Sequence, residues 1–269
     1  MLARRKLDSA GFQTWTVGGQ VVARLYLGSC FDLFDMLADC DPADRPRSLF
    51  SDPPYPLTTG GRSADPKSMG GKFSAERYAN DGKIVAGTDL AFTTWIRAAL
   101  PALQPDSDLV IMSNDRNLRD LLNAAAENAV RFHRLLVWAR QSKTPNRWIM
   151  AGAEFALYGY AGKSRPVINK PGADQITSIH GFKSATDHPT EKPVGLFAQW
   201  IGDITTPGEL IFDPFTGTGA AALGALRIGR RFIGSEIDPR HFGAACRRID
   251  DALSAGPLFA NDRPTLPLI

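Results

Sequence analysis

The sequence predicts an α/β fold, in which a mostly parallel, twisted sheet carries helices on both faces. Three observations lead to this fold class. Short apolar runs alternate with amphipathic segments along the chain, as they do in repeated β-α-β units. One of these runs leads directly into a glycine-rich turn and then an alanine-rich segment. The chain has 269 residues, of which 43% are hydrophobic, so residues 1–269 can form a single domain with one core.

The expected elements follow this alternation from the first apolar run to the last. The expected strands cover residues 21–27, 47–50, 108–112, 132–138, 154–160, 209–213 and 231–235. The expected helices cover residues 31–39, 89–99, 116–128, 193–204, 218–228 and 239–253. Two stretches do not fit the pattern. Residues 56–87 are polar and glycine-rich, and residues 141–187 contain several prolines and glycines.

The tetrapeptide Asp52, Pro53, Pro54 and Tyr55 follows the second expected strand. Proline cannot donate a hydrogen bond to a sheet and holds φ near −65°, so the backbone leaves the strand at this point. Asp and Pro are ordinary turn residues, and a plain turn is one interpretation. The other is a site for the exocyclic amino group of a flat base. The Asp52 carboxylate and the Pro53 carbonyl would accept its hydrogens, and Tyr55 would offer a stacking face.

A second motif begins at the sixth expected strand, which ends at Asp213 and runs into a turn that contains Gly217 and Gly219. A helix and another strand follow, and that strand leads to Glu236. This plan binds the ribose hydroxyls of an adenosine-type cofactor. The same spacing also fits a dinucleotide, which would make the protein a nicotinamide-dependent oxidoreductase. Asp213 favours the first interpretation, because a carboxylate at the turn would repel pyrophosphate but could hold a cationic ligand.

Together these motifs resemble those of the S-adenosylmethionine-dependent DNA amino-methyltransferases, in the beta-type order where the catalytic motif precedes the cofactor loop. Five stretches occur in the family's order: Leu25-Tyr26-Leu27-Gly28-Ser29-Cys30, Ser51-Asp52-Pro53-Pro54-Tyr55, His188-Pro189-Thr190-Glu191-Lys192-Pro193, Asp213-Pro214-Phe215-Thr216-Gly217-Thr218-Gly219 and Phe232-Ile233-Gly234-Ser235-Glu236. The resemblance implies a Rossmann-like methyltransferase fold with a small target-recognition insertion. It also implies S-adenosyl-L-methionine as cofactor and double-stranded DNA as substrate, with the target base flipped out of the stack.

The resemblance assigns a role to each motif residue. The catalytic residues would be Asp52, Pro53, Pro54 and Tyr55, and the cofactor-binding residues would be Ser29, Cys30, Asp52, His188, Lys192, Pro193, Asp213, Phe215, Gly217, Gly219 and Glu236. Glu236 would accept from the ribose hydroxyls, and the backbone around Phe215, Gly217 and Gly219 would hold the methionine end. Asp213 would bind the methionyl ammonium and Lys192 would lie near the carboxylate. An exposed lysine at a helix start is the alternative for Lys192.

One position departs from the family. The chain has Gly28-Ser29 where members usually have Gly-Asp, and Ser29 or Asp32 is expected to approach the adenine ring of the cofactor instead. The target base is less directly indicated. Adenine N6 and cytosine N4 are both exocyclic amines, but Asp at the first position of the tetrapeptide is more typical of adenine-modifying relatives. We therefore predict adenine N6 as the target. The alternatives are cytosine N4, an inactive relative that binds DNA and cofactor, and an enzyme that methylates RNA or protein.

Charge distribution suggests where DNA would bind. The net charge is only +3, but between residues 131 and 170 the basic side chains face a single acid, Glu154. The predicted DNA contacts are Arg140, Lys143, Arg147, Lys163 and Arg165, with a solvated basic face as the alternative. Residues 56–87 are expected to form a mobile loop that closes over the flipped base. Residues 141–187 are expected to supply target recognition.

Composition limits the remaining partners. The chain lacks a run of 18 apolar residues and an apolar signal core near its start, so an intracellular, cytoplasmic protein without membrane contact is expected. The cysteines Cys30, Cys40 and Cys246 lack the spacing of a metal site, and no metal is expected. The resemblance suggests a homodimer and a cognate restriction nuclease as further partners.

Overall fold

The computed structural model describes residues 4–55, 90–144, 149, 151–168, 173–179 and 191–255; for residues 4–7, 141–144 and 151 only the backbone is described. The strands are β1 (Arg4–Leu7), β2 (Phe12–Val17), β3 (Gln20–Leu27), β4 (Ser48–Ser51), β5 (Ser107–Ser113), β6 (Arg131–Thr144), β7 (Ala151–Ala161), β8 (Ile176–Ser178), β9 (Leu210–Asp213) and β10 (Arg231–Glu236). The helices are α1 (Cys30–Ala38), α3 (Phe92–Ala99), α4 (Leu118–Glu127), α5 (Val194–Ile204), α6 (Ala220–Arg227) and α7 (Pro239–Ser254), with short 3₁₀ helices η1 (Pro42–Asp44) and η2 (Leu100–Ala102).

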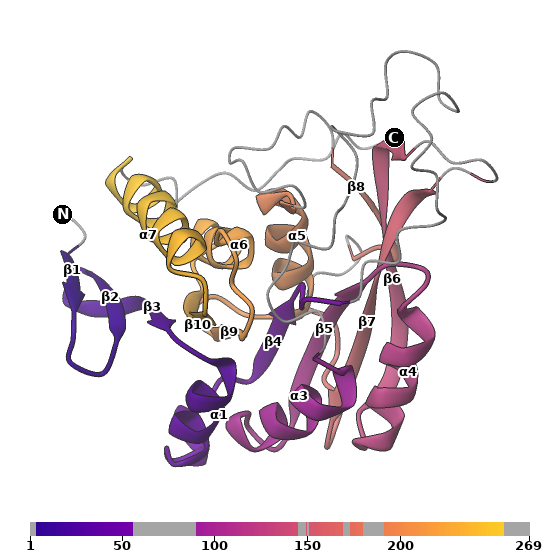
Figure 1. The fold of residues 1–269 in the computed structure, drawn as a ribbon, viewed down its shortest axis with the longest axis horizontal. Helices are drawn as coiled ribbons and strands as arrows, with labels where there is room; N and C mark the ends of the chain where they lie inside the picture. The colour runs from indigo at the N-terminus through magenta and orange to yellow at the C-terminus, as the bar shows by residue number, and fades with distance from the viewer. Residues whose placement is uncertain are drawn as a thin grey trace, which may run out of the picture.

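The ten strands form one sheet in the order β1-β2-β3-β10-β9-β4-β5-β7-β6-β8 (Figure 1). The five central strands, from β3 to β5, run parallel to one another. β7 pairs antiparallel with both β5 and β6, and β1 and β2 form an antiparallel hairpin beside β3. The predicted α/β class with a mostly parallel sheet is therefore confirmed.

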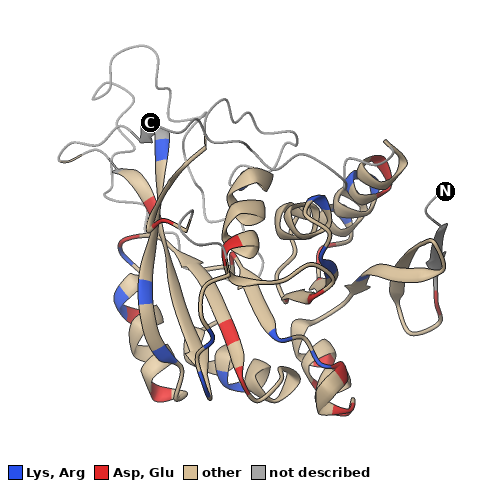
Figure 2. Ribbon diagram, turned by 180° about the vertical axis from the view of Figure 1, so that it is seen from behind, with Lys and Arg blue, Asp and Glu red and all other residues tan. Residues whose placement is uncertain are grey.

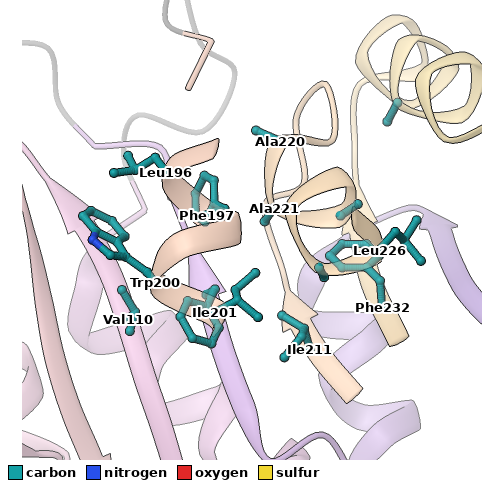
Figure 3. Packing of buried hydrophobic residues seen from close by; sticks show 14 of the residues in the cluster. Val110, Leu196, Phe197, Trp200, Ile201, Ile211, Ala220, Ala221, Leu226 and Phe232 are labelled. Atoms are coloured by element: carbon teal, nitrogen blue, oxygen red, sulfur yellow. The ribbon is translucent and has the colours of Figure 1, made fainter. Parts of the chain in front are cut away.

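Helices cover both faces of the sheet. α1, α3 and α4 pack on one face, and α5, α6 and α7 pack on the other (Figure 1). On the second face, Phe197 of α5 points toward the small residues of α6 and Ile201 toward Ile211 of β9, while Trp200 lies on the other side of α5, next to Val110 of β5 (Figure 3). The small residues let the two helices approach closely, and a Cβ at Gly224 would lie only 2.8 Å from the Ala198 backbone nitrogen. This close packing fixes α6, and with it the turn that precedes α6.

Three described strands, β1, β2 and β8, were not expected, and a local signal exists for one of them, β2. Gly18 and Gly19, which both have positive φ, connect β2 to β3. Two glycines between alternating segments are a typical hairpin signal. The third strand, β8, has only three residues and depends on its pairing with β6.

The range proposed for target recognition also contains part of the sheet itself. Residues 151–161 form β7, which separates β5 from β6. Any element dedicated to recognition must therefore come from the rest of 141–187, much of which lies outside the described residues. The loop expected at 56–87 lies outside them entirely.

The chain reverses its direction of progress through the sheet between β4 and β9. β4 leads to β5 on one side, whereas β9 leads through α6 to β10 on the other. In open α/β sheets, such a switch point opens a crevice at the carboxyl ends of the strands. The segments that carry both sequence motifs leave the sheet at this crevice.

Candidate active site

The carboxyl ends of three adjacent strands bring the predicted acids to one edge of the sheet. Asp213 ends β9 and is paired in register with Gly234 of β10, two residues before Glu236. Asp52 follows Ser51, the last residue of β4. The structure thus gathers Asp52, Asp213 and Glu236, which are far apart in sequence.

Lys192 makes the closest contact with the Asp52 carboxylate. Its Nζ lies 2.6 Å from Asp52 Oδ2, and its side chain is only 5% exposed. Burial lowers the pKa of Lys192, but Asp52, Tyr55 and Glu154 together outweigh burial and leave that pKa raised. Lys192 is therefore not an exposed lysine at a helix start, and its expected place near the methionine carboxylate stays a prediction. Pro193, the next residue, is the N-cap of α5.

Glu154, near the start of β7, extends this contact into a network. Its Oε2 lies 3.4 Å from Lys192 Nζ, and its Oε1 lies 3.5 Å from Nη1 of Arg140 in β6. Arg140 was predicted to contact DNA, yet its side chain is 22% exposed and packs into this network. We define the site network as Asp52, Lys192, Glu154 and Arg140. Sequence reasoning gave Glu154 no role, although it is the single acid in the basic stretch.

The network leaves one oxygen of Asp52 without a partner. Asp52 Oδ1 is buried and has no hydrogen-bond partner among the described residues. A buried acceptor without a partner costs roughly 1–3 kcal/mol, so a ligand that donates a hydrogen there would be bound favourably. Pro53 is buried next to it, and Tyr55 is partly buried against the α1/α3 side of the core. Burial and the Asp52 charge raise the pKa of Tyr55, so its ring stays neutral.

The glycine-rich turn after β9 is held by its own amides. The Phe215 amide donates to Asp213 Oδ1 at 3.0 Å, the Gly217 amide donates to Glu236 Oε2 at 2.7 Å, and the Gly219 amide donates to the Thr216 carbonyl at 2.9 Å. Gly217 and Gly219 have φ of +56° and +91°, which favour glycine. These three amides are occupied, so the turn would hold a methionine through carbonyl oxygens and through the free amides at the start of α6.

The Asp213 side chain also holds this turn in place through its hydrogen bonds. It is 3% exposed, and the Ser51 hydroxyl donates to its Oδ1 at 2.5 Å. Burial, together with the nearby charges of Asp52 and Glu236, raises the pKa of Asp213 to about 7. A cation near this carboxylate would favour its ionised form. The expected role of Asp213 toward an ammonium group stays a prediction.

Glu236 fits the ribose of an adenosine-type cofactor. Its Oε1 accepts from the Asp238 amide at 2.8 Å and its Oε2 from the Gly217 amide, and a carboxylate has further lone pairs for two hydroxyls. A Cβ placed at Gly217 would meet no atom closer than 4.0 Å, so open space adjoins the carboxylate. Ile237, directly after Glu236, is 63% exposed and offers an apolar surface for a flat ring. The residues present therefore fit such a cofactor.

The first motif stretch lies beside this region. The Gly28 amide donates to the Glu236 carbonyl at 3.1 Å, which places the start of α1 next to Glu236. Ser29 is the N-cap of α1, where its hydroxyl accepts from the Phe31 amide at 3.2 Å. Burial raises the pKa of the Cys30 thiol to about 11, so this cysteine is not a nucleophile. The predicted contacts of Ser29 and Cys30 with the cofactor stay predictions.

An unexpected residue, Arg248 of α7, ties two of the motifs together. Its Nη2 lies 2.7 Å from Glu191 Oε1, and its Nη1 donates to the Thr218 carbonyl at 2.8 Å. The Glu191 side chain is 1% exposed, so this pair is almost completely buried. Arg248 therefore links the glycine-rich turn to the segment that carries Lys192.

The predicted DNA contacts are corrected for one residue. Arg165 pairs with Asp108 and with Glu209, and its side chain is 13% exposed. These partners lie at the amino ends of β5 and β9, at the sheet edge opposite Asp52. Arg165 is therefore a buried structural cation and does not contact phosphates at the site.

The other basic residues are distributed differently. Lys163 is exposed, but its amide donates to Asp106, just before β5, at the same distant edge. The Lys143 side chain, Arg147 and His188 lie outside the described parts of the chain. Figure 2 shows basic segments on β6 and also on α7, at opposite ends of the ribbon.

The described residues show no sign of a metal site or of a membrane span. They contain no cluster of three or more His, Cys, Asp or Glu side chains that could hold a metal ion. None of the described helices is long and apolar enough to span a membrane. A cavity of about 280 Å³ lies between β6, β7 and α5, lined by His133, Tyr158 and Trp200 among others. It contains none of the predicted site residues.

Comparison with known proteins gives consistent matches. The DNA methylase family model matches residues 163–246. The Type II methyltransferase M2.DpnII of Streptococcus pneumoniae is 26% identical over 242 residues, which cover 81% of this chain and 87% of that protein. The solved M1.HpyAVI–SAM complex has a TM-score of 0.64 at 22% identity, covering 84% of this chain and 99% of that one. The cytosine-N4-specific PvuII DNA methyltransferase has a TM-score of 0.58 at 17% identity, covering 87% and 90%.

Proposed function

We propose that this chain, a member of the S-adenosylmethionine-dependent DNA amino-methyltransferases, methylates N6 of an adenine flipped out of double-stranded DNA. The enzyme class and the cofactor follow from the ordered motifs, the matched DNA methylase model and the shared fold. The target base is the new part of the proposal. The observation that carries transfer to an exocyclic amino group is the buried Asp52 Oδ1, an acceptor without a hydrogen-bond partner among the described residues.

The chain's own residues explain how a weak amine could react. Asp52 Oδ1 and the Pro53 carbonyl would each accept one hydrogen of the amino group, which favours a more tetrahedral nitrogen. The carboxylate would also stabilise the positive charge that develops on this nitrogen. Tyr55 would stack on the flipped base, and stacking of this kind contributes roughly 1–3 kcal/mol per base. Flipping costs a few kcal/mol, so these contacts would offset much of it.

The cofactor would lie across the carboxyl ends of β9 and β10. S-adenosylmethionine supplies the methyl group when it is bound. Glu236 would accept from its ribose hydroxyls, and Ile237 would pack against its adenine. The α6 N-terminus, whose first amides lack intrahelical partners, would face the methionine carboxylate. This arrangement would bring the methyl donor close to Asp52, because β9 and β4 are neighbours in the sheet.

The choice of adenine rests on the tetrapeptide. Asp at its first position is typical of adenine-modifying members of the family that the chain resembles. The fold does not separate the two bases, since the solved neighbours include a protein described as cytosine-N4-specific. We expect labelled methyl groups to appear in double-stranded DNA as N6-methyladenine when its nucleosides are separated. N4-methylcytosine as the product would overturn the choice of base.

Parallel incubations with RNA, with protein and with NAD would test the substrate class and the activity. Methyl incorporation into RNA or protein but not DNA would overturn the proposed substrate. Binding of the cofactor without any transfer would identify an inactive relative, and binding of NAD instead would identify an oxidoreductase. For every substrate, the variant Asp52→Ala serves as the negative control for methyl incorporation.

The remaining partners extend this proposal. A DNA substrate inside the cell places the enzyme in the cytoplasm, on DNA. A relative described as a Type II methyltransferase supports a role in restriction-modification, with a cognate nuclease that cuts the unmethylated site. Light scattering of the purified chain would test the expected homodimer. Sequencing methylated DNA from expressing cells would give the recognition site, and protection of that site from cleavage would test the nuclease.

A further inference from the structure

We propose that Glu154 is a positioning residue for the transfer, which holds Lys192 against Asp52 and offsets the positive charge of Lys192. The inference rests on the proposed function and adds a residue to it. Glu154 belongs to β7, outside both motifs that define the site. Its effect on the reaction would pass through Lys192.

The geometry forms a chain of contacts from β7 to the reacting group. Lys192 Nζ lies 2.6 Å from Asp52 Oδ2 and 3.4 Å from Glu154 Oε2. The three side chains are 5%, 22% and 16% exposed, in the order Lys192, Asp52 and Glu154. Asp52 lies in an irregular segment after β4, whereas Glu154 is held in the sheet between β5 and β6. The rigid strand can therefore fix the ammonium group that in turn orients the catalytic carboxylate.

The orientation matters because the two oxygens of Asp52 have different surroundings. Oδ2 is occupied by Lys192, while Oδ1 is buried without a partner among the described residues. If the lysine moved, the carboxylate could rotate and exchange the two oxygens. Glu154 prevents this by giving the ammonium a second anchor.

Charge gives Glu154 a second purpose. A lysine in contact with Asp52 weakens the ability of that carboxylate to stabilise positive charge on the target nitrogen. A second carboxylate next to the lysine restores the negative potential, and Arg140, at 3.5 Å from Glu154, keeps the site network balanced with two anions and two cations. Such balance makes burial of the four groups tolerable.

The first test is a double-mutant cycle with Glu154→Gln and Lys192→Met in the full chain. Single-turnover methyl transfer to double-stranded DNA should slow by about 10- to 30-fold in Glu154→Gln, within the range of coupling found for residues in one network. KM for DNA and for the cofactor should change far less, since neither is bound by Glu154. The double variant should be no slower than Lys192→Met alone, because Glu154 acts through the lysine.

Two further variants exclude a general loss of structure. Glu154→Asp keeps the charge and should recover part of the rate lost in Glu154→Gln. Glu209→Gln is the matched control, because Glu209 is also ion-paired and is 11% exposed, but it lies at the opposite edge of the sheet. It should lower the melting temperature without slowing the single-turnover rate.

Each result decides the inference. A Glu154→Gln enzyme as fast as wild type would overturn it, and so would independent, additive losses in the cycle. An equal loss of rate in Glu209→Gln would also overturn it, by showing that destabilisation alone slows the reaction. If wild type itself moved no methyl group to DNA, both the proposed function and this inference would fall, whereas failure of the cycle alone leaves the function intact.

Discussion

Two clusters of buried charge lie at opposite edges of the same sheet, and they differ in what they leave unsatisfied. The first is the site network at the carboxyl edge. The second is the distal cluster at the amino edge, formed by Arg165, Asp108, Glu209 and Ser48. Both join carboxylates to cations across β4 and its neighbours. In the site network, Asp52 Oδ1 lacks a hydrogen-bond partner and Glu154 Oε2 has only its ion pair with Lys192 at 3.4 Å, while in the distal cluster all four carboxylate oxygens accept a hydrogen bond.

The distal cluster shows how this protein completes a structural ion pair. Arg165 donates to both oxygens of Glu209 and to Asp108, while Ser48 and Tyr158 supply further hydrogen bonds. Burial raises the pKa of Glu209, but the hydrogen bonds from Arg165 and Ser48 outweigh burial and lower it. The same chain therefore satisfies buried carboxylates fully where only stability is needed. The open oxygen of Asp52 is a difference that points to a ligand.

The largest expected effect comes from removing that open acceptor. Asp52→Ala should reduce methyl transfer by about 10³-fold or more, the magnitude typical of losing a group that stabilises transition-state charge. The fold should survive, because Lys192 keeps Glu154 as a partner. Single-turnover rates and thermal unfolding of the same samples would check both statements. Near-normal turnover would show that the open oxygen is not the catalytic acceptor.

The next effect concerns stability rather than activity. Arg165→Met would leave two buried carboxylates without their cation, and breaking such a pair costs about 3–5 kcal/mol. The free energy of unfolding, measured with urea, should fall by that amount. Activity measured well below the melting temperature should stay near wild type. Weaker DNA binding in a variant of unchanged stability would instead restore Arg165 as a phosphate contact.

These two predictions separate what sequence reasoning could reach from what it could not. Asp52, Gly217 and Glu236 belong to local motifs in which neighbouring residues already specify the chemistry, so their convergence at one edge could be predicted from strand order. The partner of Lys192 could not be predicted, because Glu154 is 38 residues away on an antiparallel strand whose register the sequence does not specify.

Arg165 shows the opposite kind of error, in which the sequence suggested a contact that the structure does not support. Its position in a basic stretch suggested phosphate contact, but its buried partners come from the starts of two other strands. Charge runs describe only sequence neighbours, whereas a long arginine is satisfied by whichever carboxylates the fold brings close. A single acidic residue within a basic stretch, such as Glu154, indicated the site better than the basic residues around it did.

A smaller effect should come from the contact that joins the two motifs. Arg248→Lys would lose the forked pairing with Glu191 and Thr218, since lysine cannot replace a bidentate guanidinium. The dissociation constant for S-adenosylmethionine should rise by about 5- to 10-fold, the effect of losing roughly 1 kcal/mol. Calorimetry would measure it. Arg247→Lys is the matched control, because Arg247 is the preceding residue of α7 and is exposed. An equal loss in both variants would argue against the contact.

The smallest effect concerns pH and Asp213. Its pKa is raised to about 7 by burial and by the charges of Asp52 and Glu236, so the folded state holds a proton that the unfolded chain releases near pH 4. The stability from this proton is complete below the unfolded pKa and is lost as pH rises through 7. Asp213→Asn removes this dependence while keeping an acceptor for Ser51 and for the Phe215 amide.

Between pH 5 and pH 6 wild type should lose stability relative to Asp213→Asn, and the melting temperature of the variant should rise relative to that of wild type by about 2–4 °C, the shift expected for roughly 1 kcal/mol in a chain of this size. Asp115→Asn, at an exposed aspartate, serves as the control. Cofactor binding sharpens the comparison, because an ammonium group near Asp213 would expel the proton. Calorimetry at pH 7 in buffers of different ionisation enthalpy should detect proton release in wild type and none in Asp213→Asn. Equal proton release in wild type and in Asp213→Asn would show that the ammonium group of the cofactor lies away from Asp213. The Asp213 carboxylate would then have a structural role, like the carboxylates of the distal cluster.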